Sequence, residues 1–222
     1  MIQWHLLVQA RVATDAATKS ADAAQRQLEA IDRAWIYAEL PVIESCTLHP
    51  QGVRFDVRFT FKNVGRAVAR HISYSATLMV LTAHGGNIVR QIVDQIEGEG
   101  RIQCERAPQS FKEMGTPGPT LFPGETGGPR KADDLRVENS RIEAGAEQLP
   151  EDTRRSWEPT IVGCVVYLLP NSQTMHHTRF SYVIRKETLD KIGNPLPLGV
   201  GENVTAKDLV LMPLGMVGTD AD

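Results

Sequence analysis

The residues of this sequence best suited to chemistry are three histidines and a cysteine on neighbouring predicted strands. His176 and His177 lie on one strand opposite Cys164, and His71 lies on another. Imidazole nitrogen and cysteine sulfur are ordinary ligands of zinc. Adjacent residues of a strand point to opposite faces of a sheet, so at most one of the paired histidines can share a site with a given partner. The pattern therefore favours satisfied or exposed histidines, and we assign no metal ligand.

Patterns typical of catalytic and cofactor sites lead to no assignment either. The sequence has no G-x-S-x-G segment, which forms the nucleophile turn of many hydrolases. The glycines within 124–128 are not flanked by the strand and helix of a phosphate-binding loop. The acidic pairs at 133–134 and 151–152 are typical of solvated turns. We therefore assign no catalytic residue, no cofactor-binding residue and no cofactor.

Three basic residues lie on the polar side of one predicted strand. Arg54, Arg58 and Lys62 alternate with apolar residues, which places all three on the same face. Such a row can bind an anionic ligand. A half-exposed antiparallel sheet also needs a soluble face, and this is the favoured interpretation.

Composition limits the classes of function. The chain has 222 residues, of which 41% are hydrophobic, so it can bury a core in one large domain or two small ones. A formal net charge of −3 provides no basic surface for phosphates, which argues against nucleic acid as a partner. No stretch approaches the ~20 apolar residues that a transmembrane helix requires.

The cysteines are few and widely spaced. Cys46, Cys104 and Cys164 match neither a disulfide framework nor a zinc-binding spacing. Reduced thiols are therefore expected, with one bridge as the most that can form. Cys164 lies in the most apolar predicted strand and is expected to be buried, whereas Cys46 and Cys104 are expected to be accessible.

One strand dominates the pattern of the chain. Apolar residues from Val53 to Phe61 alternate without interruption with polar ones up to Lys62. Strict alternation of β-branched and aromatic residues with polar ones predicts a strand with one buried face. The turn signal at 49–52 joins it to a preceding strand that begins near Ala34, in which Pro41 indicates an edge position.

The remaining elements are assigned by the same patterns. Strands are expected at 69–82, 88–93, 134–142, 160–169 and 175–186. The last two strands are expected to form a hairpin. A short helix is expected at 101–114, and a loop or short helix at 143–157. The spacing of Ile88, Ile92 and Ile96 also permits a helix in place of the strand at 88–93. We attribute the turn at Asn63 and Gly65 to residue types that tolerate left-handed backbone.

The N-terminal residues predict a helix with a thin apolar stripe. Residues 3–34 contain no Gly or Pro and are rich in Ala and Gln. Residues 1–12 are apolar but too short for a signal sequence or a membrane span. The helix is expected to act as a stalk that binds a protein partner, a second copy or a membrane surface. The chain then divides into this stalk at 1–34, a β-sandwich domain at 35–190, and an extended tail at 191–222 that either packs on the sandwich or does not.

The order of several motifs carries a resemblance. RAWIYAE, VRFDVRFTFKNVGRAVAR, TLFPGE, GCVVY and HHTRFSY follow one another after an Ala-rich helix, over most of residues 20–186. This arrangement resembles a family of uncharacterised bacterial proteins that carry an N-terminal membrane anchor and a soluble β-rich domain. The N-x-G turn and the P-G-E segment are also similar to immunoglobulin-like sandwiches of bacterial surface proteins. The resemblance implies no activity, cofactor or site residue.

Together these observations predict a mainly β fold, an immunoglobulin-like antiparallel β-sandwich with a long N-terminal helix and a short inserted helix. The expected function is that of a non-enzymatic binding or structural module, cytoplasmic or associated with a membrane. The alternative is a metal-dependent or hydrolytic enzyme with a dispersed active site.

Overall fold

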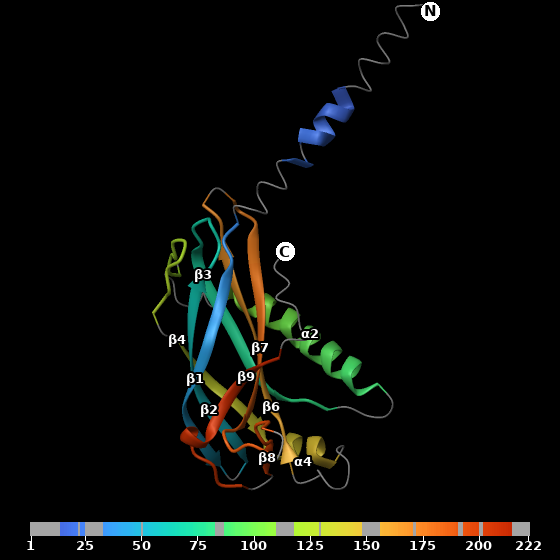
Figure 1. Ribbon diagram of the computed structural model, residues 1–222, viewed down its shortest axis with the longest axis vertical. Helices are drawn as coiled ribbons and strands as arrows, with labels where there is room; N and C mark the ends of the chain where they lie inside the picture. The colour runs from blue at the N-terminus through green and yellow to red at the C-terminus, as the bar shows by residue number, and fades with distance from the viewer. Residues whose placement is uncertain are drawn as a thin grey trace, which may run out of the picture.

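The computed structural model of this chain describes residues 14–21, 23–24, 33–49, 51–82, 87–109, 118–128, 130–147, 156–170, 172–190, 193–199 and 202–214. These residues form a mainly β fold that contains two larger antiparallel sheets (Figure 1). This confirms the predicted fold class at the level of β content and antiparallel pairing.

The first sheet has the strand order β1-β2-β4. Its strands are β1 (Ile36–His49), β2 (Gly52–Asn63) and β4 (Arg130–Glu138). The alternation of β2 is confirmed, because Val53, Phe55, Val57, Phe59 and Phe61 are all buried. β1 is an edge strand, as Pro41 indicated, and its register shifts between Glu39 and Val42. β4 begins four residues earlier than the predicted strand at 134–142, and helix α4 (Asn139–Glu147) replaces the end of that strand.

The second sheet has the order β3-β6-β7-β9. Its strands are β3 (Arg70–Val80), β6 (Pro159–Leu168), β7 (Met175–Lys186) and β9 (Leu209–Pro213). The hairpin of β6 and β7 is confirmed, and nine of the ten residues of β6 are buried. The sequence leaves open whether the segment after residue 190 packs on the sheets. In the structure β8 (Leu198–Gly199) pairs with β5 (Ser156–Trp157), and the short helix η1 (Ala206–Asp208) leads into β9.

The two sheets pack face to face around a cluster of aromatic rings. The ring of Phe59 on β2 lies 5.2 Å from that of Phe180 on β7, and the ring of Phe61 lies 5.1 Å from that of Tyr74 on β3. Gly163 makes room for Phe180, because a Cβ at this position would lie 2.3 Å from the ring. The alternation of apolar residues in each strand thus becomes one shared core.

Polar groups also join the sheets across this core. The buried hydroxyl of Tyr182 donates a hydrogen bond to the carbonyl oxygen of Ala38 at 2.7 Å, and the hydroxyl of Tyr167 donates to that of Ala34 at 2.7 Å. Burial raises the pKa of both phenols, so both remain protonated donors at neutral pH. These bonds hold the start of β1 against the second sheet.

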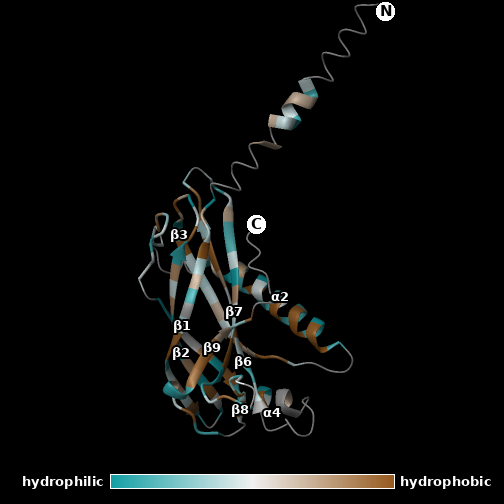
Figure 2. Cartoon of the chain, in the orientation of Figure 1, coloured by the Kyte–Doolittle hydropathy of each residue, from teal (hydrophilic) through white to brown (hydrophobic). Residues whose placement is uncertain are grey.

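Helix α2 (Ile88–Arg106) covers the outer face of the second sheet (Figure 1). The predicted strand at 88–93 is therefore wrong and the alternative helix is correct. Apolar residues recur along this helix (Figure 2), and its residue Ile96 is buried. The side chain of Gln103, also buried, accepts a hydrogen bond from Ser75 on β3 at 2.6 Å. The first part of the helix predicted at 101–114 is the end of α2, which ends at Arg106, and residues 110–114 of that prediction lie outside the described residues.

A disulfide joins α2 to the sheet that it covers. Cys104 on α2 and Cys164 on β6 are bonded, with their Cα atoms 5.0 Å apart. The expectation of reduced thiols is therefore wrong for these two residues, and Cys46 is the free cysteine. The expectation that Cys164 is buried is confirmed, since its exposed fraction is 0%.

Asn63 and Gly65 form the turn after β2 for a reason other than the one inferred from their residue types. Neither has a positive φ among the described residues. Gly65 instead lies against the incoming chain, because a Cβ there would be 2.3 Å from the carbonyl oxygen of Arg33. Attributing this turn to left-handed backbone is thus wrong, and close backbone approach explains the glycine.

The predicted N-terminal helix falls largely outside the described residues. Residues 14–21 are helical, and their side chains are exposed. In the described part of the chain, no helix combines the length and the apolar composition needed to cross a membrane.

Candidate functional site

The structure does not bring the histidines and Cys164 together as zinc ligands. The sulfur of Cys164 is bonded to Cys104, and its register partner on β7 is Arg179. His177 lies opposite Val166, and the ring of His176 stacks on Tyr167 with the centroids 5.9 Å apart. Among the described residues, no group of three or more His, Cys, Asp or Glu side chains can hold a metal ion. The hypothesis of a His/Cys metal site that includes Cys164 is therefore wrong.

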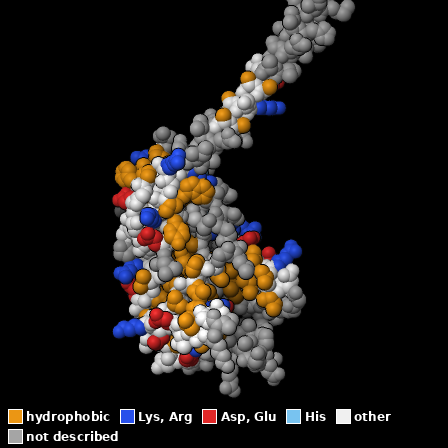
Figure 3. Space-filling view, viewed as in Figure 1, with side chains coloured by type: hydrophobic (Ala, Val, Ile, Leu, Met, Phe, Trp, Pro, Cys, Tyr) orange, Lys and Arg blue, Asp and Glu red, His pale blue; other side chains and the backbone are white. Residues whose placement is uncertain are grey.

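Arg54 and Arg58 of β2 are partners in ion pairs on the outer face of the first sheet. Arg58 lies 3.4 Å from the carboxylate of Glu44 on β1, and Arg54 lies 3.2 Å from Asp56 on its own strand. Acidic and basic side chains are interspersed over the face that Figure 3 shows. The interpretation of Arg58 as part of a soluble sheet face thus agrees with its surroundings.

Asp56 is the centre of the larger of these networks. One of its oxygens accepts a hydrogen bond from Arg54 Nε at 3.2 Å. The other accepts one from the hydroxyl of Ser45 at 2.8 Å and lies 3.5 Å from Lys131 Nζ on β4. The bond from Ser45, followed by the charges of Lys131 and Arg54, holds the pKa of Asp56 below its usual range. Asp56 is therefore a carboxylate whose two oxygens both have donors.

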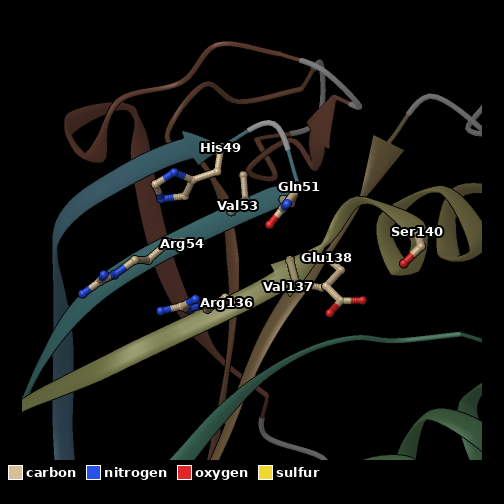
Figure 4. Close-up of a pocket in the computed structure, with 9 residues that line it drawn as sticks. His49, Gln51, Val53, Arg54, Arg136, Val137, Glu138 and Ser140 are labelled. Carbon is tan, nitrogen blue, oxygen red and sulfur yellow. The ribbon is translucent and has the colours of Figure 1, made fainter.

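A hollow of about 820 Å³ lies next to this network, at the end of the first sheet. We call it the outer pocket (Figure 4). Its described lining residues come from the end of β1, the start of β2, the end of β4 and the start of α4: His49, Gln51, Gly52, Val53, Arg54, Arg136, Val137, Glu138 and Ser140.

Close backbone packing determines the floor of the outer pocket. Gly52 is the register partner of Glu138, and a Cβ on Gly52 would lie 2.1 Å from the carbonyl oxygen of Val137. Only glycine fits this approach. The amide of Asn139 donates to the carbonyl oxygen of Gln51 at 2.9 Å, which ties the start of α4 to the turn between β1 and β2. Backbone contacts thus hold together the strand ends and the helix start that surround the outer pocket.

A second hollow of about 280 Å³, the inner pocket, lies on the other side of the same turn. Its lining is mainly apolar and includes Leu48, Ile142, Trp157 and Leu198, with the free thiol of Cys46 among them. Burial raises the pKa of this thiol, which keeps it protonated and poorly nucleophilic at neutral pH. Its position therefore favours a packing role for Cys46 over a catalytic one.

Glu202 lies at the rim of the inner pocket as a fixed carboxylate. Lys186 donates to it at 3.0 and 3.1 Å, and the amide of Gly199 donates at 2.8 Å. These bonds, that of Lys186 first, lower the pKa of Glu202. A carboxylate held in this way is a poor general base, since its proton affinity is reduced.

Sequence reasoning identified Arg54 but missed its neighbour Arg136. The available signal was the alternation of Leu135, Arg136 and Val137, which predicts that Arg136 points outward. The alternation could not predict that β4 pairs with β2, because strand order is not encoded in local periodicity.

The comparisons with known proteins add no relative. No protein-family model matches this sequence, no curated protein is similar to it, and no solved structure matches its fold. The resemblance to anchored bacterial proteins with a β-rich domain therefore stays a prediction from the motifs.

Proposed function

We propose that this chain is a non-enzymatic binding module with an immunoglobulin-like sandwich, attached by its N-terminal helix to a membrane surface or to a protein partner. The strand order supports the immunoglobulin-like part. Immunoglobulin domains place the first, second, fourth and fifth strands in one sheet and the third, sixth and seventh in the other. Here β1, β2 and β4 pair in one sheet, and β3, β6 and β7 pair in the other. Helix α2 occupies the interval in the sequence where the fourth strand of such domains lies.

The observation that carries the proposal is the construction of the outer pocket at one end of the sandwich. Binding residues of such folds are commonly held by turns at the ends of the sheets, where a rigid scaffold positions them. The turn at 49–52 and the start of α4 hold this pocket through the contacts of Gly52 and Asn139. The polar groups that line it are donors and acceptors suited to binding. In the neighbouring inner pocket, the thiol of Cys46 and the carboxylate of Glu202 are in states unsuited to nucleophilic or base catalysis.

The N-terminal helix supplies the attachment in this proposal. Its composition favours a helix, but its apolar stripe consists mainly of alanine and buries little area against a domain. The exposed side chains of residues 14–21 agree with a segment that does not pack on the sheets. Trp4, Leu6 and Leu7 then remain available to a lipid interface or to a second copy.

Limited proteolysis, liposome flotation and analytical sedimentation of the full chain test this proposal. Trypsin is expected to cut between Arg11 and Arg26 and to leave a folded remainder, while the intact chain floats with liposomes or sediments above the monomer mass. Flotation identifies a lipid surface as the attachment, and sedimentation above the monomer mass identifies a second copy. A protease-resistant helix in a monomeric chain that ignores lipid would contradict the attachment.

A further inference from the structure

We infer that the outer pocket binds an oxyanion, the carboxylate or phosphate group of a ligand, between Arg54 and Arg136. This deepens the proposed function and rests on it, because it names the chemistry that the binding module recognises. The inference follows from the register of two strands, the residues that line the pocket and the position of a helix start.

The register places the two arginines side by side. Arg54 on β2 and Arg136 on β4 are direct partners, between the pairs Val53 with Val137 and Phe55 with Leu135. These four flanking apolar residues are buried, so the alternation directs both arginines outward. Directly opposed residues have Cβ atoms about 5 Å apart, and like charges at that distance repel. An oxyanion between the two guanidinium groups turns this repulsion into two charge-assisted interactions.

Figure 4 shows this arrangement from within the pocket. The side chains of Arg54 and Arg136 extend to the same side, while Glu138 extends the other way. His49, on β1, lies on the same side of the view as the arginines. The two arginines and His49 therefore lie on one side of this view.

The acid that pairs with Arg54 is shared with other donors. Asp56, which pairs with Arg54, is also bonded to Ser45 and lies within ion-pair distance of Lys131. One carboxylate is thus divided between two cations. Among the described residues that line the outer pocket, Glu138 is the one acid, against two arginines. The lining of the outer pocket therefore contains more basic than acidic side chains, although the whole chain carries −3.

The start of α4 adds a further favourable field. This helix has nine residues, carries no acidic residue in its first turn, and places Ser140 in the lining of the outer pocket. The first amides of a helix lack partners within the helix and carry partial positive charge, which stabilises a nearby anion. By itself a helix start would not identify a site. Here it borders a pocket that two opposed arginines already define.

Arg58 provides the contrast within the same strand. It faces outward as Arg54 does, but it is paired with Glu44 on β1 and does not line the outer pocket. The row of Arg54, Arg58 and Lys62 suggested by the sequence is therefore replaced by a cross-strand pair. Arg58→Gln is a matched control, because it removes an exposed arginine from the same face of the same strand.

The test is a titration of the full chain with sodium phosphate or sodium acetate, at constant ionic strength set by sodium chloride. Backbone amide signals of Gly52, Arg54 and Ser140 in heteronuclear NMR are expected to shift in a saturable way. Arg54→Gln and Arg136→Gln are each expected to weaken the apparent affinity at least about tenfold, since each removes a charged hydrogen-bond donor. Arg58→Gln is expected to bind within about twofold of the natural chain, because surface substitutions outside a site have small effects. Heteronuclear NMR spectra of each variant in sodium chloride, without phosphate or acetate, show whether that variant is folded.

Each outcome decides the inference. Binding of both probes supports an oxyanion site, binding of phosphate alone assigns phosphate as the group, and binding of acetate alone assigns carboxylate. Absence of saturable shifts, or equal affinity in all three variants, would overturn the inference. If the anions fail to bind while the full chain still floats or self-associates, only this inference falls. If attachment fails as well, the proposed function falls with it.

Discussion

Asn63 is the residue that orders the end of the sandwich where the N-terminal segment arrives. Its buried side chain accepts from the amides of Trp35 and Gly65 and donates to the carbonyl oxygens of Ala67 and Leu121. One amide group thus joins three segments far apart in the sequence. Because the side chain of Asn63 is buried, its amide group depends on these partners for its hydrogen bonds.

We expect Asn63→Ala to destabilise the protein by about 2–4 kcal/mol, since it removes the four hydrogen bonds of a buried side chain. Urea unfolding followed by fluorescence measures this change. Val64→Ala in the same turn is the control, because Val64 is exposed and its truncation is expected to cost less than about 0.5 kcal/mol. Similar losses for both variants would contradict the role assigned to the amide.

Asp56 gives a dependence of stability on pH. Its native pKa is lowered, so its interactions stabilise the protein fully above its unfolded pKa of about 3.9 and are lost as the pH falls through the native value. Asp56→Asn is therefore expected to be less stable than the natural chain at pH 7 and to approach it at low pH. Urea unfolding across this range measures the difference. Ser45→Ala removes the largest cause and should reproduce part of the effect, and a constant difference at all pH values would refute it.

For single residues, the sequence predicted burial better than it predicted the structural reason for a given residue type. The alternation from Val53 to Phe61 identified the buried face of β2 correctly, because a period of two leaves no other solution once one face is apolar. Gly65 was assigned to the turn for the wrong reason, since the nearby carbonyl of Arg33 belongs to a distant part of the sequence. Arg136 was missed as a partner of Arg54 because their contact depends on strand order.

Among the elements, α2 shows where local pattern fails. Ile88, Ile92 and Ile96 fit a helical period, and a turn signal at 85–87 also favours a returning strand. Contacts with the outer face of the second sheet favour the helix. The hydroxyl of Ser73 donates to the carbonyl oxygen of Ala107, directly after α2, and the hydroxyl of Ser75 donates to the side chain of Gln103 on α2. Packing of this kind between distant segments cannot be read from a window of neighbouring residues.

The disulfide between α2 and β6 is expected to be the main covalent support of that packing. Cys104→Ala together with Cys164→Ala should lower the free energy of unfolding by about 2–5 kcal/mol, because the bridge closes a long loop in the unfolded chain. Urea unfolding under non-reducing conditions measures this loss. Cys46→Ala is the control without a bridge.

The same bridge changes the expected count of thiols. When oxidised protein is denatured without a reducing agent, one cysteine per chain should react with an alkylating reagent, and that cysteine is Cys46. Protein produced in a reducing cytosol should contain three reactive thiols and unfold at lower urea, since disulfides form in oxidising compartments. Three thiols in fully oxidised protein would contradict the bridge. The sequence could not assign the pair, because 60 residues separate the two cysteines and only the fold brings them together.

For the whole molecule, the core extends beyond the segment that the strand patterns marked most clearly. Buried residues from both sheets and from the segment after residue 190 form one cluster, which contains Phe59, Ile184, Leu198 and Leu211. The glycines and prolines of 191–222 left this contribution open, since β9 has only five residues and β8 has two. Short strands carry little periodic signal, and their pairing partners decide their structure.

The last prediction concerns whether β9 unfolds together with the rest of the sandwich. Leu211 is buried, pairs with Ile184 on β7, and belongs to the common core cluster. Leu211→Ala is therefore expected to cost about 2–4 kcal/mol, the usual range for a buried leucine. If the core is one cooperative unit, amides of β6 and β9 should lose hydrogen-exchange protection together in this variant. Lys207→Ala in the exposed helix η1 is the control and should change neither strand. Loss of protection in β9 alone would show that this strand is a separate, weaker unit attached to the edge of the second sheet.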